Sequence, residues 1–225
     1  MIAAATEPLQ GALADLFAQP VAVGVADPRQ DYGPLPPEER AAIRRASPAR
    51  AREFAAGRMA ARAALAALGR FGEPVASGRD RAPRWPSGLV GSIAHSRSHG
   101  IAAVAEEGRL AALGIDIEPD SPLPPDLAPL ICDRAESAWL QAQPAEERGR
   151  WARLIFSAKE AAYKCQYPLS RTMLGFEAFR ITFLPGARFA AEFCRQARRF
   201  RPGDVLEGRF AFCQGQMITA VALEG

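Results

Sequence analysis

The chain has 225 residues and carries 28 basic and 25 acidic side chains, which gives a net charge of +3. Its length predicts one large domain or two small ones, and its ordinary content of hydrophobic and charged residues, 48% and 24%, excludes disorder as the main state. No apolar run approaches the ~20 residues of a membrane-spanning helix, and the N-terminus lacks the basic segment of a signal peptide.

The first predicted elements are a short strand and two helices. Residues 21–26 form the strand, and Pro37 begins a helical stretch with glutamates in its first turn, where they suit the helix dipole. Ser47, which precedes a proline, is the predicted N-cap of a second helix that runs to about Leu68 and stops at Gly69.

A β-rich section follows a predicted loop at residues 72–88. Strands are predicted at residues 91–96, 101–105 and 110–118. Residues 119–130 contain five prolines in twelve positions, which predicts an extended linker rather than a helix or a strand.

The C-terminal part begins with helical patterns and ends in strands. Helices are predicted at residues 133–143 and 151–166, and Pro168 is expected to end the second one. The predicted antiparallel strands are residues 179–183, 187–193, 205–213 and 217–223. Each half of the chain therefore runs from helix to strands, which fits two similar small lobes.

The strand at 110–118 carries two acidic residues on one face. Gly114, Asp116 and Glu118 alternate with apolar residues, so the two carboxylates lie ~6.5–7 Å apart at Cα and can converge on one hard cation such as Mg²⁺. A half-buried strand with a solvated acidic face is the alternative, and taken alone the pattern favours it. Gly114 argues slightly against it, because glycine is depleted from strand interiors unless another group approaches closely.

The only two lysines, Lys159 and Lys164, lie five positions apart, whereas every other basic residue is arginine. This clustering indicates a need for a compact ammonium group. Glu160 stands one turn before Lys164, and a surface ion pair worth ~0.2–0.5 kcal/mol is the simplest interpretation. The surrounding helix is nearly all apolar, however, which favours a buried site where a third carboxylate joins the strand pair and the lysines contact phosphate oxygens.

Basic and polar groups also gather in the first half. His95 and Ser96 end a predicted strand and could donate hydrogen bonds to a phosphate, although the residues alone favour a structural histidine that caps a turn. Arg58 and Arg62 stack one turn apart on the second predicted helix, with Arg50 two turns before Arg58. The small net charge fits an anionic ligand but is too small to indicate nucleic acid.

Four short motifs carry a family resemblance. They are Trp85-Pro-Ser-Gly-Leu-Val-Gly-Ser-Ile-Ala-His95, Gly114-Ile-Asp-Ile-Glu118, Phe156-Ser-Ala-Lys-Glu-Ala-Ala-Tyr-Lys164 and Leu174-Gly-Phe176. In this order, over about residues 45–185, the chain resembles the Sfp/EntD-type 4′-phosphopantetheinyl transferases. The second and third motifs together match the specific double motif of that family.

The resemblance implies an α+β fold of two similar pseudo-symmetric lobes, each a helix plus an antiparallel sheet, with the ligand cleft between them. The expected lobes are residues 1–115 and 116–225. It also implies a Mg²⁺-dependent enzyme that transfers 4′-phosphopantetheine from coenzyme A to a serine of an apo acyl or peptidyl carrier protein and releases 3′,5′-ADP. The pathways implied by analogy are siderophore, polyketide and lipid biosynthesis.

The resemblance further implies roles for individual residues. Asp116, Glu118 and Glu160 would hold Mg²⁺ on the diphosphate of coenzyme A, and Glu160 would take the proton of the serine hydroxyl. Lys164 and Lys159 would neutralise charge at the diphosphate. The other contacts to coenzyme A, chiefly at its 3′-phosphate, would come from Arg50, Arg58, Arg62, His95 and Ser96, with Arg79 or Arg81 in place of a family lysine.

Further expectations concern location, partners and alternative functions. The four cysteines are widely spaced, which indicates neither a zinc site nor a disulfide framework and favours a reduced, cytoplasmic protein. A monomer without nucleic-acid or membrane partners is expected. The alternatives are another Mg²⁺-dependent enzyme acting on coenzyme A or a nucleotide diphosphate, and a non-catalytic module that binds coenzyme A.

Overall fold

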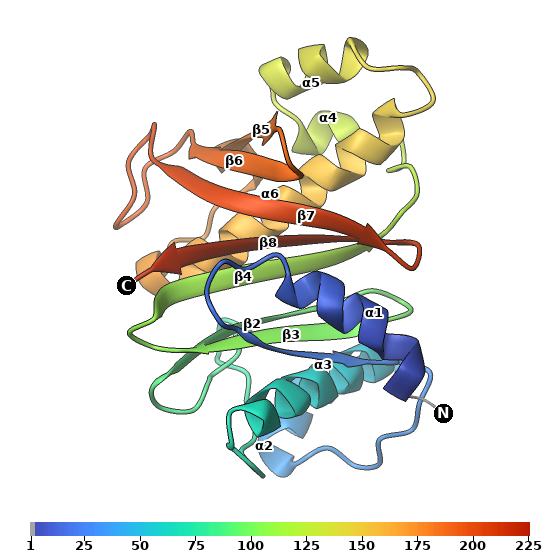
Figure 1. Ribbon diagram of the computed structural model, residues 1–225, viewed down its shortest axis with the longest axis vertical. Coiled ribbons are helices and arrows are strands. Elements are labelled where there is room, and N and C mark those ends of the chain that lie inside the picture. The colour runs from blue at the N-terminus through green and yellow to red at the C-terminus, as the bar shows by residue number, and fades with distance from the viewer. Residues whose placement is uncertain (1–2) are drawn as a thin grey trace. The chain divides into compact units, whose positions relative to one another are not determined.

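The computed structural model describes residues 3–225, with side chains from residue 6 onward. It contains two compact units: one extends to Ala111 and includes Glu224–Gly225, and the other comprises Ala112–Leu223. Helices accompany one β-sheet in each unit, so the fold class is α+β (Figure 1). In the described part of the chain, no helix is both long and apolar enough to cross a membrane.

A three-stranded sheet packed on a long helix forms the core of the first unit. The strand order is β1-β3-β2, with antiparallel pairing. The helix packs through buried alanines, and small strand residues let it approach: a Cβ at Gly24 would lie 2.1 Å from the carbonyl oxygen of Ala60. The elements are α1 (Ala3–Ala14), β1 (Ala22–Ala26), α2 (Pro37–Arg40), a 3₁₀ helix (Ala41–Ile43), α3 (Pro48–Ala67), β2 (Leu89–His95) and β3 (Gly100–Glu106).

The ends of α3 agree with the sequence signals. Ser47 caps its N-terminus, since its Oγ accepts a hydrogen bond from the backbone nitrogen of Arg50 at 3.3 Å. Gly69 follows its C-terminus with a left-handed φ of +74°, a conformation that glycine adopts without strain. The helix predicted between these two residues is therefore confirmed.

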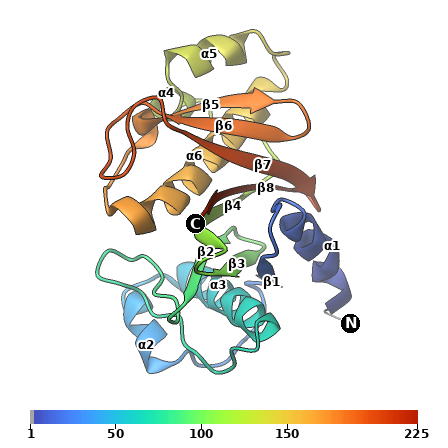
Figure 2. The ribbon, with the colours of Figure 1, turned by 60° about the vertical axis from the view of Figure 1, so that its left-hand side comes forward.

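A five-stranded sheet covered by α6 forms the core of the second unit (Figure 2). The strand order is β4-β8-β7-β6-β5. Phenylalanines from the sheet, including Phe179, Phe189 and Phe193, are fully buried in one cluster with alanines of α6. The elements are β4 (Leu110–Pro119), α4 (Ala128–Ile131), α5 (Arg134–Gln141), α6 (Arg148–Ser170), a 3₁₀ helix (Phe176–Ala178), β5 (Phe179–Leu184), β6 (Arg188–Phe193), β7 (Val205–Cys213) and β8 (Gln216–Glu224).

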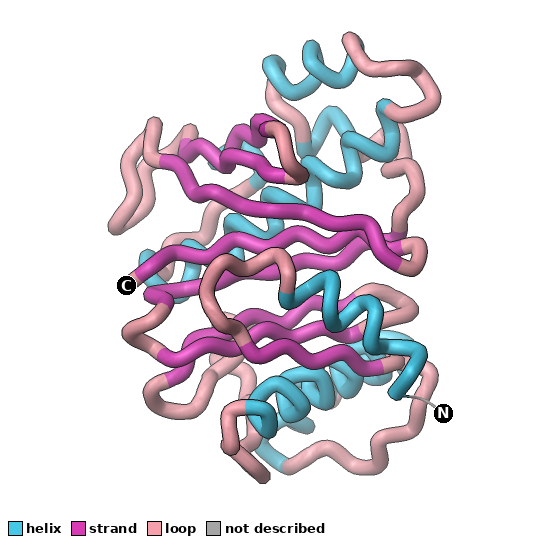
Figure 3. The backbone as a smooth tube through the Cα atoms, viewed as in Figure 1, coloured by secondary structure: helices cyan, strands magenta, loops and turns pink. Residues whose placement is uncertain are grey.

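Three parts of the chain differ from the sequence-based expectations (Figure 3). The helix α1 was not predicted. The segment expected to be an extended linker includes the first three residues of α4 and is held against α6 by hydrogen bonds, including one of 2.8 Å from the Leu123 nitrogen to the Gly149 oxygen. Pro168 does not end α6, because Cys165, Tyr167 and Ser170 are buried and their packing holds the last turn despite the missing donor.

Candidate functional site

A close approach of β4 to α6 positions the acidic strand. A Cβ at Gly114 would lie 2.0 Å from the carbonyl oxygen of Ala161 and 2.5 Å from the backbone nitrogen of Cys165. Only glycine therefore allows the backbones of β4 and α6 to lie this near. The sequence indicated such a close approach, because glycine is depleted from strand interiors. The same contact brings β4 within hydrogen-bond distance of Lys164.

We expect Gly114→Ala to lower the free energy of unfolding by about 1–3 kcal/mol, because the added methyl group overpacks a contact between two backbones. Urea denaturation followed by circular dichroism measures this change. Gly11→Ala is the matched control, since a Cβ at Gly11 meets no atom within 4 Å. Equal stability of Gly114→Ala and the wild-type protein would contradict the packing argument.

Asp116 is buried, with 6% of its surface exposed. Its Oδ1 accepts a 2.7 Å hydrogen bond from Nζ of Lys164, which also donates to the carbonyl oxygen of Ile115 at 3.2 Å. Its Oδ2 is buried and has no hydrogen-bond partner in the described chain. A buried carboxylate oxygen without a donor is costly unless a cation or a proton satisfies it, so a solvated acidic face is excluded at Asp116.

The two other acidic residues of the predicted site have raised pKa values. Burial is the main cause of the raised pKa of Glu118, and the charge of Asp116 adds to it. Arg153 opposes this shift, with its NH1 2.6 Å from Oε2 of Glu118. Burial also raises the pKa of Glu160, where Lys164 lowers the pKa and Asp116 raises it. Such environments occur at functional carboxyl groups.

These residues fit a divalent cation in their chemistry. In the part of the chain that the structure describes, no group of three His, Cys, Asp or Glu side chains already has the spacing of metal ligands. Mg²⁺, however, takes one or two carboxylates and completes its shell with substrate phosphates and water. The unpartnered Oδ2 of Asp116 offers such a cation its first ligand.

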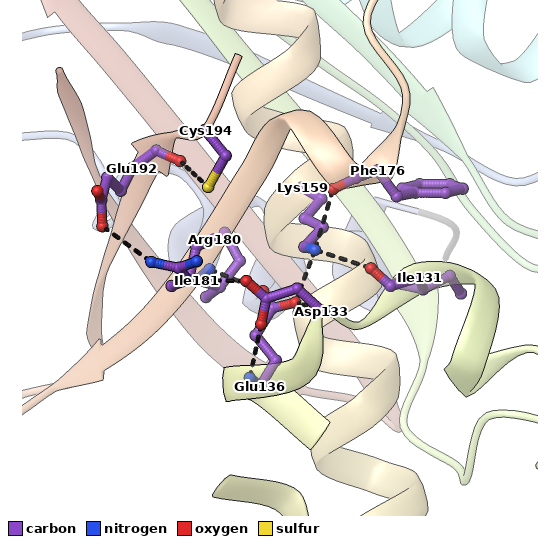
Figure 4. Close-up of polar contacts among 9 residues, drawn as sticks. All are labelled: Ile131, Asp133, Glu136, Lys159, Phe176, Arg180, Ile181, Glu192 and Cys194. Carbon is purple, nitrogen blue, oxygen red and sulfur yellow. Dashed lines mark hydrogen bonds and ion pairs between the residues drawn. The ribbon is translucent and has the colours of Figure 1, made fainter. Parts of the chain in front are cut away.

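Lys159 lies away from these carboxylates and is 1% exposed. Its Nζ donates to Oε2 of Glu136 at 2.8 Å and to the carbonyl oxygens of Ile131 at 2.8 Å and Phe176 at 3.0 Å (Figure 4). An ammonium group has three protons, and these three bonds use them all. The fold itself occupies the charge of Lys159, which favours a structural role, and the expectation that it neutralises a diphosphate stays a prediction.

The carboxylate of Glu136 extends this buried network. Its Oε1 accepts from the backbone nitrogen of Ile181 at 2.8 Å, and its Oε2 accepts from that of Asp133 at 2.7 Å. Asp133 in turn caps α5 and pairs with Arg180 at 2.7 Å (Figure 4). One ion pair thus fastens α5, α6 and β5 together.

In the first unit, Arg50 and His95 lie side by side. NH1 of Arg50 stands 3.3 Å from Nδ1 and 2.5 Å from Nε2 of His95, at the end of β2. Oε2 of Glu53 is the nearby acid, 3.5 Å from Arg50 and 3.6 Å from His95. Ser96 shapes the following turn, since its Oγ accepts from the backbone nitrogen of His99 at 3.2 Å. A guanidinium and an imidazole in contact are suited to bind a phosphate.

Arg58 is 5% exposed, although it carries a full charge. Its guanidinium lies 4.3 Å from the centre of the Phe54 ring, and its NH2 donates to Oγ of Ser77 at 2.9 Å. Its Nε is buried and has no hydrogen-bond partner in the described chain. Burial lowers the pKa of Arg58 to about 10, and Arg62 contributes in the same direction. An anion would satisfy this group.

Arg62 has a different environment from Arg58. Its NH2 pairs with Oε2 of Glu39, which is fully buried, and Oε1 of Glu39 accepts from the backbone nitrogen of Val75 at 2.9 Å. In this structure the charge of Arg62 neutralises a buried carboxylate that holds α2 and a loop, and its expected phosphate contact stays a prediction.

Sequence reasoning missed Glu39, Glu136 and Arg153. The sequence Asp133-Arg-Ala-Glu136 gave a usable signal for Glu136, because an N-cap acid followed three positions later by glutamate is a capping box. Arg153 stands seven positions before Glu160, on the same face of α6. Glu39 had no signal in the sequence, since its partner comes from a different helix.

Two family models match the chain and together cover most of it. The model of the 4′-phosphopantetheinyl transferase N-terminal domain matches residues 38–105, and that of the 4′-phosphopantetheinyl transferase superfamily matches residues 112–212.

Curated proteins give the same result. The chain is 40% identical over 196 residues to 4′-phosphopantetheinyl transferase Svp of Streptomyces mobaraensis, covering 83% of this chain and 78% of that protein. It is 35% identical over 195 residues to 4′-phosphopantetheinyl transferase PptT of Mycobacterium tuberculosis, covering 83% and 85%. It is 37% identical over 152 residues to enterobactin synthase component D of Salmonella typhi, covering 67% and 61%.

Proposed function

Because this chain belongs to the 4′-phosphopantetheinyl transferase superfamily, we propose how its residues transfer 4′-phosphopantetheine from coenzyme A to a serine of a carrier protein. The serine oxygen forms a bond to the phosphorus of the phosphopantetheine group. The bond from that phosphorus to the bridging oxygen breaks, and 3′,5′-ADP leaves with the electron pair. The proton of the serine hydroxyl passes to a base on the enzyme.

Asp116, Glu118 and Glu160 are the proposed ligands of Mg²⁺. When bound, Mg²⁺ would supply positive charge at the transferring and leaving phosphate oxygens. Lys164, whose Nζ is 2.7 Å from Asp116, would hold the same oxygens from the protein side. The buried, unpartnered Oδ2 of Asp116 is the single observation that carries this proposal.

Glu160 is the proposed base. Its raised pKa makes the carboxylate a stronger proton acceptor than an ordinary glutamate, which suits general-base work nearer neutral pH. Lys164 lies one turn further along α6, and its positive charge favours the ionised carboxylate because it opposes the rise in pKa that burial causes. The pair therefore combines a proton acceptor with a fixed positive charge.

The 3′-phosphate of coenzyme A is the proposed ligand of Arg50, His95 and Arg58. The contact between Arg50 and His95 and the unpartnered Nε of Arg58 support this assignment. Ser96 would orient His95 through its turn rather than bind the nucleotide by itself.

The proposal includes an arrangement of two similar lobes, 1–115 and 116–225, with coenzyme A between them. The helix-and-sheet content of each compact unit supports the division into two similar lobes. A monomeric, cytoplasmic enzyme is also proposed. Relatives named for enterobactin synthesis favour a carrier protein of siderophore biosynthesis as the partner, with polyketide and lipid carriers as the other classes.

Removal of the metal tests this proposal. We expect transfer to be lost when EDTA is added and to return when Mg²⁺ is restored in excess. Intact-mass spectrometry of an apo carrier protein incubated with the enzyme and coenzyme A measures the gain of one phosphopantetheine group. Coenzyme A breakdown without a modified carrier would point to a hydrolase, and transfer that survives EDTA would exclude the metal.

A further inference from the structure

Arg153 contacts three acceptors through three different nitrogens. Its NH1 lies 2.6 Å from Oε2 of Glu118, its Nε donates to the carbonyl oxygen of Ser121 at 2.8 Å, and its NH2 donates to that of Pro122 at 2.9 Å. The side chain of Arg153 is 13% exposed and that of Glu118 22%. The guanidinium therefore sits in a fixed geometry between α6 and the end of β4.

Neighbouring contacts also hold the segment after β4 against α6. Arg150 pairs with both oxygens of Asp120, at 2.5 and 2.9 Å, and the backbone nitrogen of Leu123 donates to the carbonyl oxygen of Gly149 at 2.8 Å. A Cβ at Gly149 would lie 2.8 Å from Cβ of Pro122. Residues 120–123 are thus held against α6 by several contacts. Of the α6 residues that make these contacts, Arg153 also binds a proposed metal ligand.

We propose that Arg153 is a positioning residue for the metal, an inference that rests on the proposed function. Its bond commits Oε2 of Glu118 to the guanidinium, so Oε1 is the oxygen left for a cation. Its two carbonyl contacts fix the guanidinium, and through it the carboxylate rotamer. Partners that orient a metal ligand in this way typically contribute about 10–100-fold to metal affinity.

The test compares Arg153→Met with Arg150→Met. Arg150→Met removes the ion pair with Asp120 in the same segment and leaves the contact between Glu118 and Arg153 intact. It therefore controls for a purely structural effect. Mn²⁺ binding to the protein with coenzyme A but no carrier, measured by electron paramagnetic resonance, reports metal affinity without turnover. The Mg²⁺ concentration for half-maximal transfer and the rate at saturating Mg²⁺ are measured beside it.

We expect Arg153→Met to weaken Mn²⁺ binding and raise the half-saturating Mg²⁺ concentration by about 10–100-fold, with the rate at saturating Mg²⁺ within a few-fold of wild type. Arg150→Met should leave all three values near wild type. Arg153→Lys keeps a cation beside Glu118 but loses the two hydrogen bonds to the carbonyl oxygens of Ser121 and Pro122, so its metal affinity should be intermediate. This variant replaces Arg153→Met in the test if Arg153→Met does not fold.

Unchanged metal affinity in the Arg153 variants would overturn the inference, as would an equal loss in Arg150→Met. A lower saturated rate with unchanged Mg²⁺ dependence would also overturn it. A different result would contradict the proposed function. If the wild-type protein still transferred phosphopantetheine in the presence of EDTA, the reaction would not need the metal, and the inference about Arg153 would fall as well.

Discussion

Replacing Glu160 by glutamine is expected to lower the rate of phosphopantetheine transfer by about 10²–10⁴-fold, the usual contribution of a general base. Glutamine keeps the size of the side chain but cannot accept the serine proton. It also removes a negative charge from the proposed metal site, so the measured loss lies at the upper end of this range or beyond. Initial rates of carrier modification, followed by intact mass, measure the effect.

Glu146→Gln is the matched control for this variant. Glu146 is an exposed glutamate just before α6, so the same substitution there changes the net charge equally without touching the site. We expect its rate to equal that of the wild-type protein. Wild-type turnover by Glu160→Gln at saturating Mg²⁺ would show that another group accepts the proton.

The second large effect is expected for stability. Lys159→Met should lower the free energy of unfolding by about 3–5 kcal/mol, because it leaves the carboxylate of Glu136 buried without its counter-charge. Glu136 and Lys159 are each almost fully buried, with side chains 1% exposed. Urea denaturation monitored by circular dichroism measures the loss, and a lower melting temperature should accompany it.

Arg180→Met is the comparison within the same network. Arg180 pairs with Asp133 at 2.7 Å, but its side chain is 42% exposed, so removal of this pair should cost at most about 1 kcal/mol. If Lys159→Met were as stable as wild type and instead lost coenzyme A affinity, the lysine would be a phosphate ligand and the structural role would be wrong.

The contrast between the two lysines shows what the sequence could predict about the site. Lys159 and Lys164 are five positions apart, a rotation of ~140° around a helix, whereas Glu160 and Lys164 differ by ~40°. Lys164 therefore shares a face of α6 with Glu160, and its contact with Asp116 follows from that face. Lys159 points to a different side of α6. The motif alone could not show which of the two lysines would pair with a buried acid such as Glu136.

Local signals in the sequence located the elements that carry the site. The Ser47 cap, the alternation around Asp116 and the glycine at position 114 all describe local geometry, and the structure has α3, β4 and the close helix contact where they indicate. The hydrogen bonds that hold residues 120–123 come from side chains of α6 some thirty positions away. A proline-rich composition reports only the absence of a regular element, so it predicted an extended linker without these contacts to α6.

The environments of the two lysines also matter for bioconjugation. They are the only side chains of the chain with a primary amine, and Lys159 is 1% exposed with every proton bonded. Lys164 has 26% of its side chain exposed, so an amine-reactive ester has one accessible side-chain target, which lies beside Asp116. Coupling of a dye or a sensor surface to a side-chain amine would therefore modify the proposed reaction centre, and the yield of Lys164 labelling would report whether that site is occupied.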